Sequence, residues 1–322
     1  MTNLKIGALL VMFALVIGSW YLTCAAGQYD EVTAGFFPLE TRHFERLSVI
    51  TVGTGGAHED HNRSGPSTAV GIGQQIWLVD AGRGLADALR KAKIPMVQPS
   101  TVLLTSLLPE NTLGLDDLLA ASWLEGRRER IRLLGPAGTA DLARNIEAAV
   151  RPSLEVWSRG LAEELGDPGF DVTEIAGGWT VASESIEVNA GALPGGPAPA
   201  LAYRFDWRGR ILVVGGTGFN DDALVEFARG AHTLVHEANY IPTVEEAKTA
   251  ELDTDPADLE RQARMHTTLA DVGMLATRAG VETLVLVRLR PPPVYTLQVT
   301  SFVNDTFEGS ILVPSDGDEI TP

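Results

Sequence analysis

Short β-branched runs, each ended by a glycine-rich turn, alternate with helical segments along both halves of the chain. Leu47–Val52 ends in Gly53-Thr54-Gly55-Gly56, and Ile211–Val214 ends in Gly215-Gly216-Thr217-Gly218. β-Branched runs bounded by turn residues are typical of strands, and apolar residues three and four positions apart are typical of helices. Strands are predicted at 47–52, 67–70, 75–79, 101–105, 131–134, 185–188, 200–205, 211–214, 232–236, 283–287 and 310–313, and helices at 85–93, 115–124, 139–150, 221–229, 269–279 and 299–307. This order predicts one α/β domain of stacked sheets with outer helices.

The first residues differ from the rest because they form a long apolar run. Lys5 precedes uncharged residues from Ile6 to about Ala26, which is about the length that crosses a bilayer as a helix. A positive start followed by an apolar stretch and small residues is also typical of a signal peptide. We therefore predict a signal peptide or membrane anchor at 1–26, a linker at 27–46 and the α/β domain at 47–322, with a periplasmic or other extracytoplasmic localisation.

Net charge and residue counts exclude several kinds of site. The chain carries 42 acidic and 25 basic residues, a formal net charge of -17. Such a surface repels phosphate backbones, so no nucleic-acid partner is predicted. Its single cysteine, Cys24, excludes an internal disulfide and a cysteine-based zinc cluster. With 6 histidines and no His-x-His pair, histidine ligands for metals are scarce as well.

Several motifs, taken in order, resemble the metallo-β-lactamase superfamily, with the arylsulfatase-like and ribonuclease Z-like hydrolases as the closest branch. The resemblance runs from about Leu47 to Ile320 and implies an αββα sandwich with its site at the edge between two sheets. The motifs are Val52-Gly53-Thr54-Gly55-Gly56, Arg63-Ser64-Gly65-Pro66-Ser67-Thr68, Asp80-Ala81-Gly82-Arg83-Gly84, Trp123-Leu124-Glu125-Gly126-Arg127, Leu134-Gly135-Pro136-Ala137-Gly138-Thr139, Ala202-Tyr203-Arg204-Phe205, His236-Glu237-Ala238 and His266-Thr267-Thr268.

The family uses two metal ions, usually zinc, to activate the water that attacks an ester. By the resemblance, the metal-ligand positions of this chain are Ser106, Leu108, Glu110, Asn111, a position near Gly195-Gly196, Gly216 and Arg288, with Asp80 behind them as the residue that steadies the ligands. Of the seven ligand positions, only Glu110 holds a good metal ligand. The sequence therefore predicts that the dinuclear site is lost and that no cofactor is needed. One zinc or other divalent ion at a relocated site, on His58 and His61, is the alternative.

Two further hypotheses concern the remaining polar residues. Arg288 and Glu110 replace groups that face one metal, and we expect them to form a salt bridge. His236, Glu237 and His266 match residues that assist proton transfer in ribonuclease Z-like proteins, so they form a residual catalytic cluster or are retained for structure.

These observations predict an exported or membrane-anchored pseudoenzyme with a binding or scaffolding role. Its partners would be a small molecule or a protein, the membrane where the first segment is uncleaved, and a second copy in a homodimer. The alternative is a hydrolase, acting on a phosphodiester, a sulfate or another ester, with a remodelled or single-metal site. Metal content and turnover of generic esters distinguish the two.

Overall fold

The chain divides into two compact units, Met1–Glu40 and Thr41–Pro322. The computed structural model describes residues 12, 16–20, 23, 39–57, 60–164, 166–183, 186–218, 221–290 and 296–322. Most of the predicted segment 1–26, Cys24 included, lies outside these residues. Within the part of the chain that the structure describes, no helix has both the length and the apolar composition needed to span a membrane.

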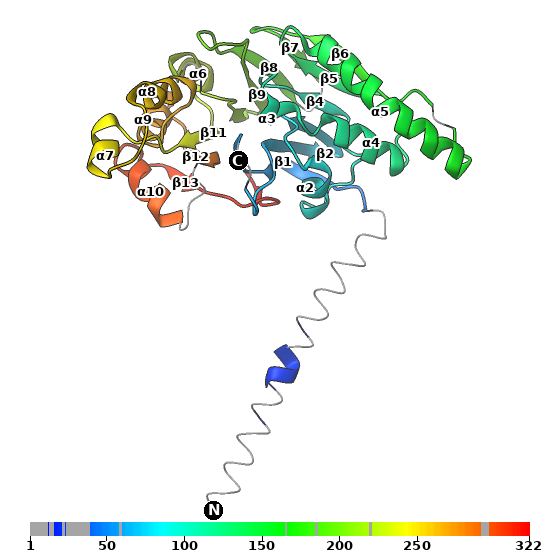
Figure 1. The fold of residues 1–322 in the computed structure, drawn as a ribbon, viewed down its shortest axis with the longest axis horizontal. Helices are drawn as coiled ribbons and strands as arrows, with labels where there is room; N and C mark the ends of the chain where they lie inside the picture. The colour runs from blue at the N-terminus through cyan, green and yellow to red at the C-terminus, as the bar shows by residue number, and fades with distance from the viewer. Residues whose placement is uncertain are drawn as a thin grey trace, which may run out of the picture. The chain divides into compact units, whose positions relative to one another are not determined.

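The second unit contains two seven-stranded sheets (Figure 1). The first has the order β14-β1-β2-β3-β4-β5-β6 and the second has the order β13-β12-β11-β10-β9-β8-β7. Strands of the first sheet are β1 (Phe44–Gly53), β2 (Ser67–Gly73), β3 (Gln75–Val79), β4 (Thr101–Leu103), β5 (Ile131–Gly135), β6 (Phe170–Glu174) and β14 (Glu319–Ile320). Those of the second are β7 (Thr180–Ala182), β8 (Glu187–Ala192), β9 (Leu201–Trp207), β10 (Arg210–Val214), β11 (Thr233–Asn239), β12 (Thr283–Arg290) and β13 (Ser310–Leu312).

Three apolar clusters show that the two sheets stack as the inner layers of an αββα sandwich. One cluster lies between the sheets and joins residues such as Val79 and Leu103 to Tyr203 and Val285. The others pack helices onto the outer face of each sheet. The helices are α2 (Leu85–Lys91), α3 (Pro109–Thr112), α4 (Leu115–Leu124), α5 (Thr139–Leu161), α6 (Asp221–Ala228), α7 (Val244–Thr249), α8 (Pro256–Met265), α9 (Leu269–Ala279) and α10 (Thr296–Asn304). The predicted four-layer fold is thus confirmed.

Most predicted elements form, and the differences lie where the local pattern is weak. Helix α5 continues to Leu161, beyond the predicted end near Val150, and includes Pro152. Its N-cap is Gly138, in a left-handed conformation, rather than Thr139. Strands β6, β7 and β14 were not predicted from the sequence, because their residues are largely exposed and lack a buried alternation.

Parallel pairing brings the ends of several strands to one edge of the sandwich. β3, β4 and β5 run parallel in the first sheet, and β10, β11 and β12 run parallel in the second. A hydrogen bond of 2.9 Å from Asp80 N to Leu103 O ties the loop after β3 to β4, and one of 2.7 Å from Leu201 N to Thr105 O joins the two halves of the chain. Loops at the carboxyl ends of parallel strands are the usual place for a site in α/β folds.

Candidate functional site

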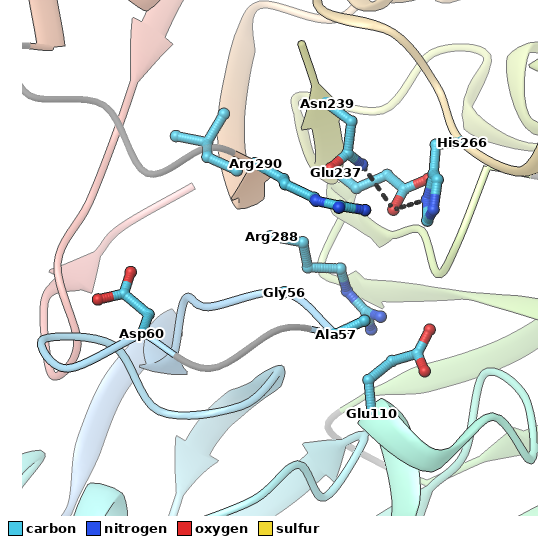
Figure 2. Close-up of a pocket in the computed structure, with 10 residues that line it drawn as sticks. Gly56, Ala57, Asp60, Glu110, Glu237, Asn239, His266, Arg288 and Arg290 are labelled. Atoms are coloured by element: carbon cyan, nitrogen blue, oxygen red, sulfur yellow. Dashed lines mark hydrogen bonds and ion pairs between the residues drawn. The ribbon is translucent and has the colours of Figure 1, made fainter. Parts of the chain in front are cut away.

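A small cleft lies where these loops meet (Figure 2). Its volume is about 50 Å³, which is room for roughly three or four water molecules. In Figure 2, Glu110 extends from one side, Glu237 and His266 lie on the other, and Arg288 and Arg290 extend between them from β12. The lining residues are Gly56, Ala57, Asp60, Glu110, Glu237, Asn239, His266, Arg288, Leu289 and Arg290.

Beneath the cleft, Arg288 and Asp80 form a buried ion pair. Arg288 Nη2 donates to Asp80 Oδ2, and Arg288 Nη1 donates to Asn111 Oδ1 at 2.7 Å. Asp80 also accepts from Thr105 N at 2.8 Å. The exposed fraction is 0% for Asp80 and 6% for Arg288. Burial raises the pKa of Asp80 even though the Arg288 guanidinium acts in the opposite direction, so the carboxylate depends on Arg288 to stay ionised.

The predicted salt bridge between Arg288 and Glu110 is therefore wrong. No ion pair within 4.0 Å joins Glu110 to a cation among the described residues, whereas Arg288 pairs with Asp80. The physical reason is burial: a fully buried carboxylate needs a countercharge, and half-buried Glu110 has access to water. Arg288 has a φ of 55°, a left-handed backbone conformation that costs an arginine about 1–3 kcal/mol and is held only where its surroundings impose it.

Glu237 and His266 form a second ion pair, which opens onto the cleft. His266 Nδ1 lies 3.2 Å from Glu237 Oε2, and Glu237 also accepts from Gly218 N at 2.6 Å and Thr267 N at 3.1 Å. Burial by itself would lower the pKa of His266, but the hydrogen bond and charge of Glu237, with a contribution from Glu110, raise it overall. Burial would raise the pKa of Glu237, and His266 lowers it overall. When protonated, His266 is held by the Glu237 carboxylate through Nδ1, and the Nε2 of His266 has no hydrogen bond to any described residue.

His236 does not join this pair, so the predicted cluster of His236, Glu237 and His266 forms only in part. Neighbours along a strand point to opposite faces, so His236 lies behind Glu237 on β11. Its Nε2 is 2.9 Å from Thr267 Oγ1, which donates to Asp221 Oδ1 at 2.6 Å. Burial lowers the pKa of His236, whose exposed fraction is 0%. The geometry therefore places Glu237 and His266, but not His236, in the cleft.

The residues at the predicted metal-ligand positions bond to one another instead of forming a set of metal ligands. Asn111 Nδ2 donates to Ser106 Oγ at 2.8 Å, and Leu108 packs against the core of the second sheet. A Cβ atom added at Gly216 would lie 2.7 Å from Thr105 Oγ1, so no carboxylate side chain fits there as the structure stands. Among the described residues, no group of three or more histidine, cysteine or acidic side chains could hold a metal ion. The donor set does not fit a zinc pair.

The relocated metal site predicted on the first loop is only partly described. His58 lies outside the described residues, and His61 is exposed and does not line the cleft.

Sequence reasoning missed Arg290 and Asn239 as lining residues of the cleft. A signal for Arg290 was present, because residues two apart on a strand share a face and Arg288 had already been singled out.

Comparisons with known proteins agree with this fold. No family model matches the chain. A protein named ribonuclease Z from Mycobacterium avium is 28% identical over 252 residues, which cover 76% of this chain and 86% of that protein. Among solved structures, the metallo-β-lactamase fold protein YhfI of Bacillus subtilis has a TM-score of 0.66 at 15% identity, and human tRNase Z, short form, has 0.61 at 19%. Each covers 85% of this chain over 99% of its own length. The predicted resemblance to the ribonuclease Z-like branch is confirmed, and the arylsulfatase-like branch is not supported.

The same relatives correct four predictions. The exported pseudoenzyme is wrong, because the relatives are named as ribonucleases and their name points to a hydrolase of nucleic acid. The exclusion of a nucleic-acid partner is wrong for the same reason. The relatives named ribonuclease Z also contradict the periplasmic localisation. The expectation of no cofactor is also contradicted, since Zn²⁺-bound PqqB from Methylobacterium extorquens has this fold, with a TM-score of 0.61 at 14% identity over 85% of this chain and 99% of its own.

Proposed function

We propose that this chain, which has the metallo-β-lactamase fold and a sequence similar to those of ribonuclease Z proteins, hydrolyses a phosphodiester bond in a nucleic acid. One observation carries the proposal. A carboxylate without an ion-pair partner among the described residues, two guanidinium groups and the His266–Glu237 pair surround one cleft of about 50 Å³.

The two arginines supply the binding of the phosphate. The guanidinium of Arg290 makes no ion pair or hydrogen bond with any described residue, so it is available to an anion. Arg288 uses two of its five N–H donors on Asp80 and Asn111 and lines the cleft. Guanidinium groups bind phosphate oxygens with paired hydrogen bonds. A local field of this kind is compatible with a net charge of -17, because the potential inside a narrow cleft depends on the nearest charges.

Proton transfer would run between the two sides of the cleft. Glu110 takes a proton from a water molecule as the water oxygen forms its bond to phosphorus. His266 gives its Nε2 proton to the ester oxygen as the bond from that oxygen to phosphorus breaks, and Glu237 holds the imidazolium in place through Nδ1. The raised pKa of His266 suits a general acid near neutral pH. The products are a phosphomonoester and an alcohol, and Glu110 and His266 exchange their protons with water afterwards.

Zinc has no step in this scheme, because the residues at the family's ligand positions do not fit a zinc pair. Since the fold binds zinc in a solved relative, metal content is measured alongside activity.

Turnover of a precursor transfer RNA and of bis(p-nitrophenyl) phosphate tests the proposal, with and without a chelator and with elemental analysis of the purified chain. His266→Ala and Glu110→Gln are expected to lower kcat by about 10²–10⁴-fold each. The loss should be smaller for His266→Ala on the p-nitrophenyl ester, because p-nitrophenol leaves without being protonated. His43→Ala, which changes an exposed histidine outside the cleft, is the matched control. Absence of turnover in the wild-type chain on both substrates, or variants as active as the control, would overturn the proposal.

A further inference from the structure

A second hollow adjoins the cleft, and His266 lines both of them. It lies where the start of α6, the end of α8 and one face of α9 meet. Asp221 and Asp222 contribute from α6, Arg264 from α8, and Met274 and Arg278 from α9. Its volume is about 420 Å³, within the range of about 300–1,000 Å³ that is typical of sites for small molecules. The hollow is large enough for a nucleoside, and the cleft is not.

Charges in the hollow are balanced within the protein. Arg278 Nη2 donates to Asp222 Oδ1 at 2.6 Å, and Asp221 accepts from Thr267 Oγ1 at 2.6 Å. A third carboxylate, Asp271, accepts from Thr268 Oγ1 at 2.5 Å. The carboxylates of this hollow equal the cations in number once His266 is protonated. Acidic and cationic side chains are equal in number in the cleft as well, so what favours a phosphate there is the guanidinium of Arg290, which has no partner among the described residues.

An exposed apolar side chain offers a surface for a planar group. Met274 is 48% exposed and lines the hollow, as does Arg264. The thioether of methionine and the plane of a guanidinium both make favourable contacts with aromatic rings. Such a pair binds an uncharged heterocycle without reading its edges, as stacking platforms for bases do.

We propose that this hollow binds the nucleoside of the leaving group. This inference rests on the proposed function. A general acid at His266 Nε2 contacts the leaving oxygen, so the leaving group extends from the cleft past His266 and into the hollow. The substrate unit is then a phosphodiester in the cleft whose leaving side is a nucleoside with its base between Met274 and Arg264. The balanced charges of the hollow favour a base and sugar over a second phosphate.

Two substrates that differ in their leaving group test the inference. A dinucleoside monophosphate releases a nucleoside, whereas an analogue without the base on its leaving side releases only the sugar. Met274→Asp and Arg264→Ala should each raise KM for the dinucleotide about tenfold, since stacking contributes about 1–3 kcal/mol per base. Neither variant should change KM for the analogue. Leu161→Asp, which places the same charge at an equally exposed apolar site on α5, is the matched control.

Equilibrium dialysis with adenosine and with cytidine separates failure of this inference from failure of the proposed function. Binding to the wild-type chain that Met274→Asp abolishes, and Leu161→Asp does not, supports the nucleoside site even where neither ester is hydrolysed. Absence of nucleoside binding to the wild-type chain overturns the inference, as does an equal change in KM for both substrates.

Discussion

Replacing Arg288 by methionine should destabilise the protein strongly, because the change leaves Asp80 as an unpaired buried carboxylate. Asp80 is fully buried, and Arg288 provides its only ion pair among the described residues. Removing one partner of a buried pair costs about 3–5 kcal/mol, a large share of the roughly 5–15 kcal/mol by which a domain is stable. Asp80 keeps its hydrogen bonds from Thr105, which favours the lower end of that range.

Urea unfolding at neutral pH measures this loss, and a second variant identifies its cause. In Arg288→Met/Asp80→Asn, the amide keeps the shape of the carboxylate without its charge, so we expect most of the lost free energy of unfolding to return. The single variant should also recover on acidification. Because the pKa of Asp80 is raised in the folded protein, the folded state binds its proton more tightly than the unfolded state does. The contribution of Asp80 to the free energy of unfolding therefore falls as pH rises through the pKa that Asp80 has in the folded protein. This fall should be steeper in the variant that lacks Arg288.

Three outcomes would refute this reasoning. One is a loss below about 1 kcal/mol in Arg288→Met, the range of an exposed ion pair. Another is a double variant no more stable than the single one, and the third is a deficit that does not shrink in acid. Any of them would mean that the buried pair of charges does not act as a unit.

Two further predictions concern the second ion pair and the first glycine-rich loop. Activity should fall as pH rises through the raised pKa of His266, and Glu237→Gln should move this fall to lower pH by lowering that pKa. NMR titration of the His266 imidazole measures the pKa directly. An unchanged pKa in Glu237→Gln would show that Glu237 is not the cause of the raised value. Gly53→Ala should prevent folding, since its Cβ would lie 1.9 Å from Gly65 O. Gly160→Ala is the matched control in α5, because its Cβ would meet nothing within 4 Å. It should stabilise the helix by up to about 1 kcal/mol. Thermal melts compare the two variants, and a folded, fully stable Gly53→Ala protein would contradict the close approach.

Much of the fold was predictable because its signals are local. Helices α4 and α9 begin and end at the residues that the sequence predicts, and Gly280 ends α9 in the left-handed conformation expected after a helix. Apolar strands with glycine turns between them were equally clear. The elements that were missed, such as β7 at a sheet edge, are exposed and carry no periodic pattern.

Several residues of the site were also predictable from their motifs and their order along the chain. Glu110, Glu237, His266 and Arg288 all stand at motif positions, and all four line the cleft.

The pairing of polar side chains, in contrast, was decided by the tertiary structure alone. Arg288 was assigned to Glu110 because the two positions face one metal in relatives, yet it pairs with Asp80, 208 residues away along the chain. The guanidinium pairs with the carboxylate that is buried away from water, and burial is set by the packing of the whole sandwich. The net charge of the chain gave a wrong prediction about nucleic acid for a similar reason. It averages over the whole surface, whereas a phosphate would meet only the few groups in the cleft. The sequence by itself determined the strands, helices and turns, and packing decided which of their polar side chains meet.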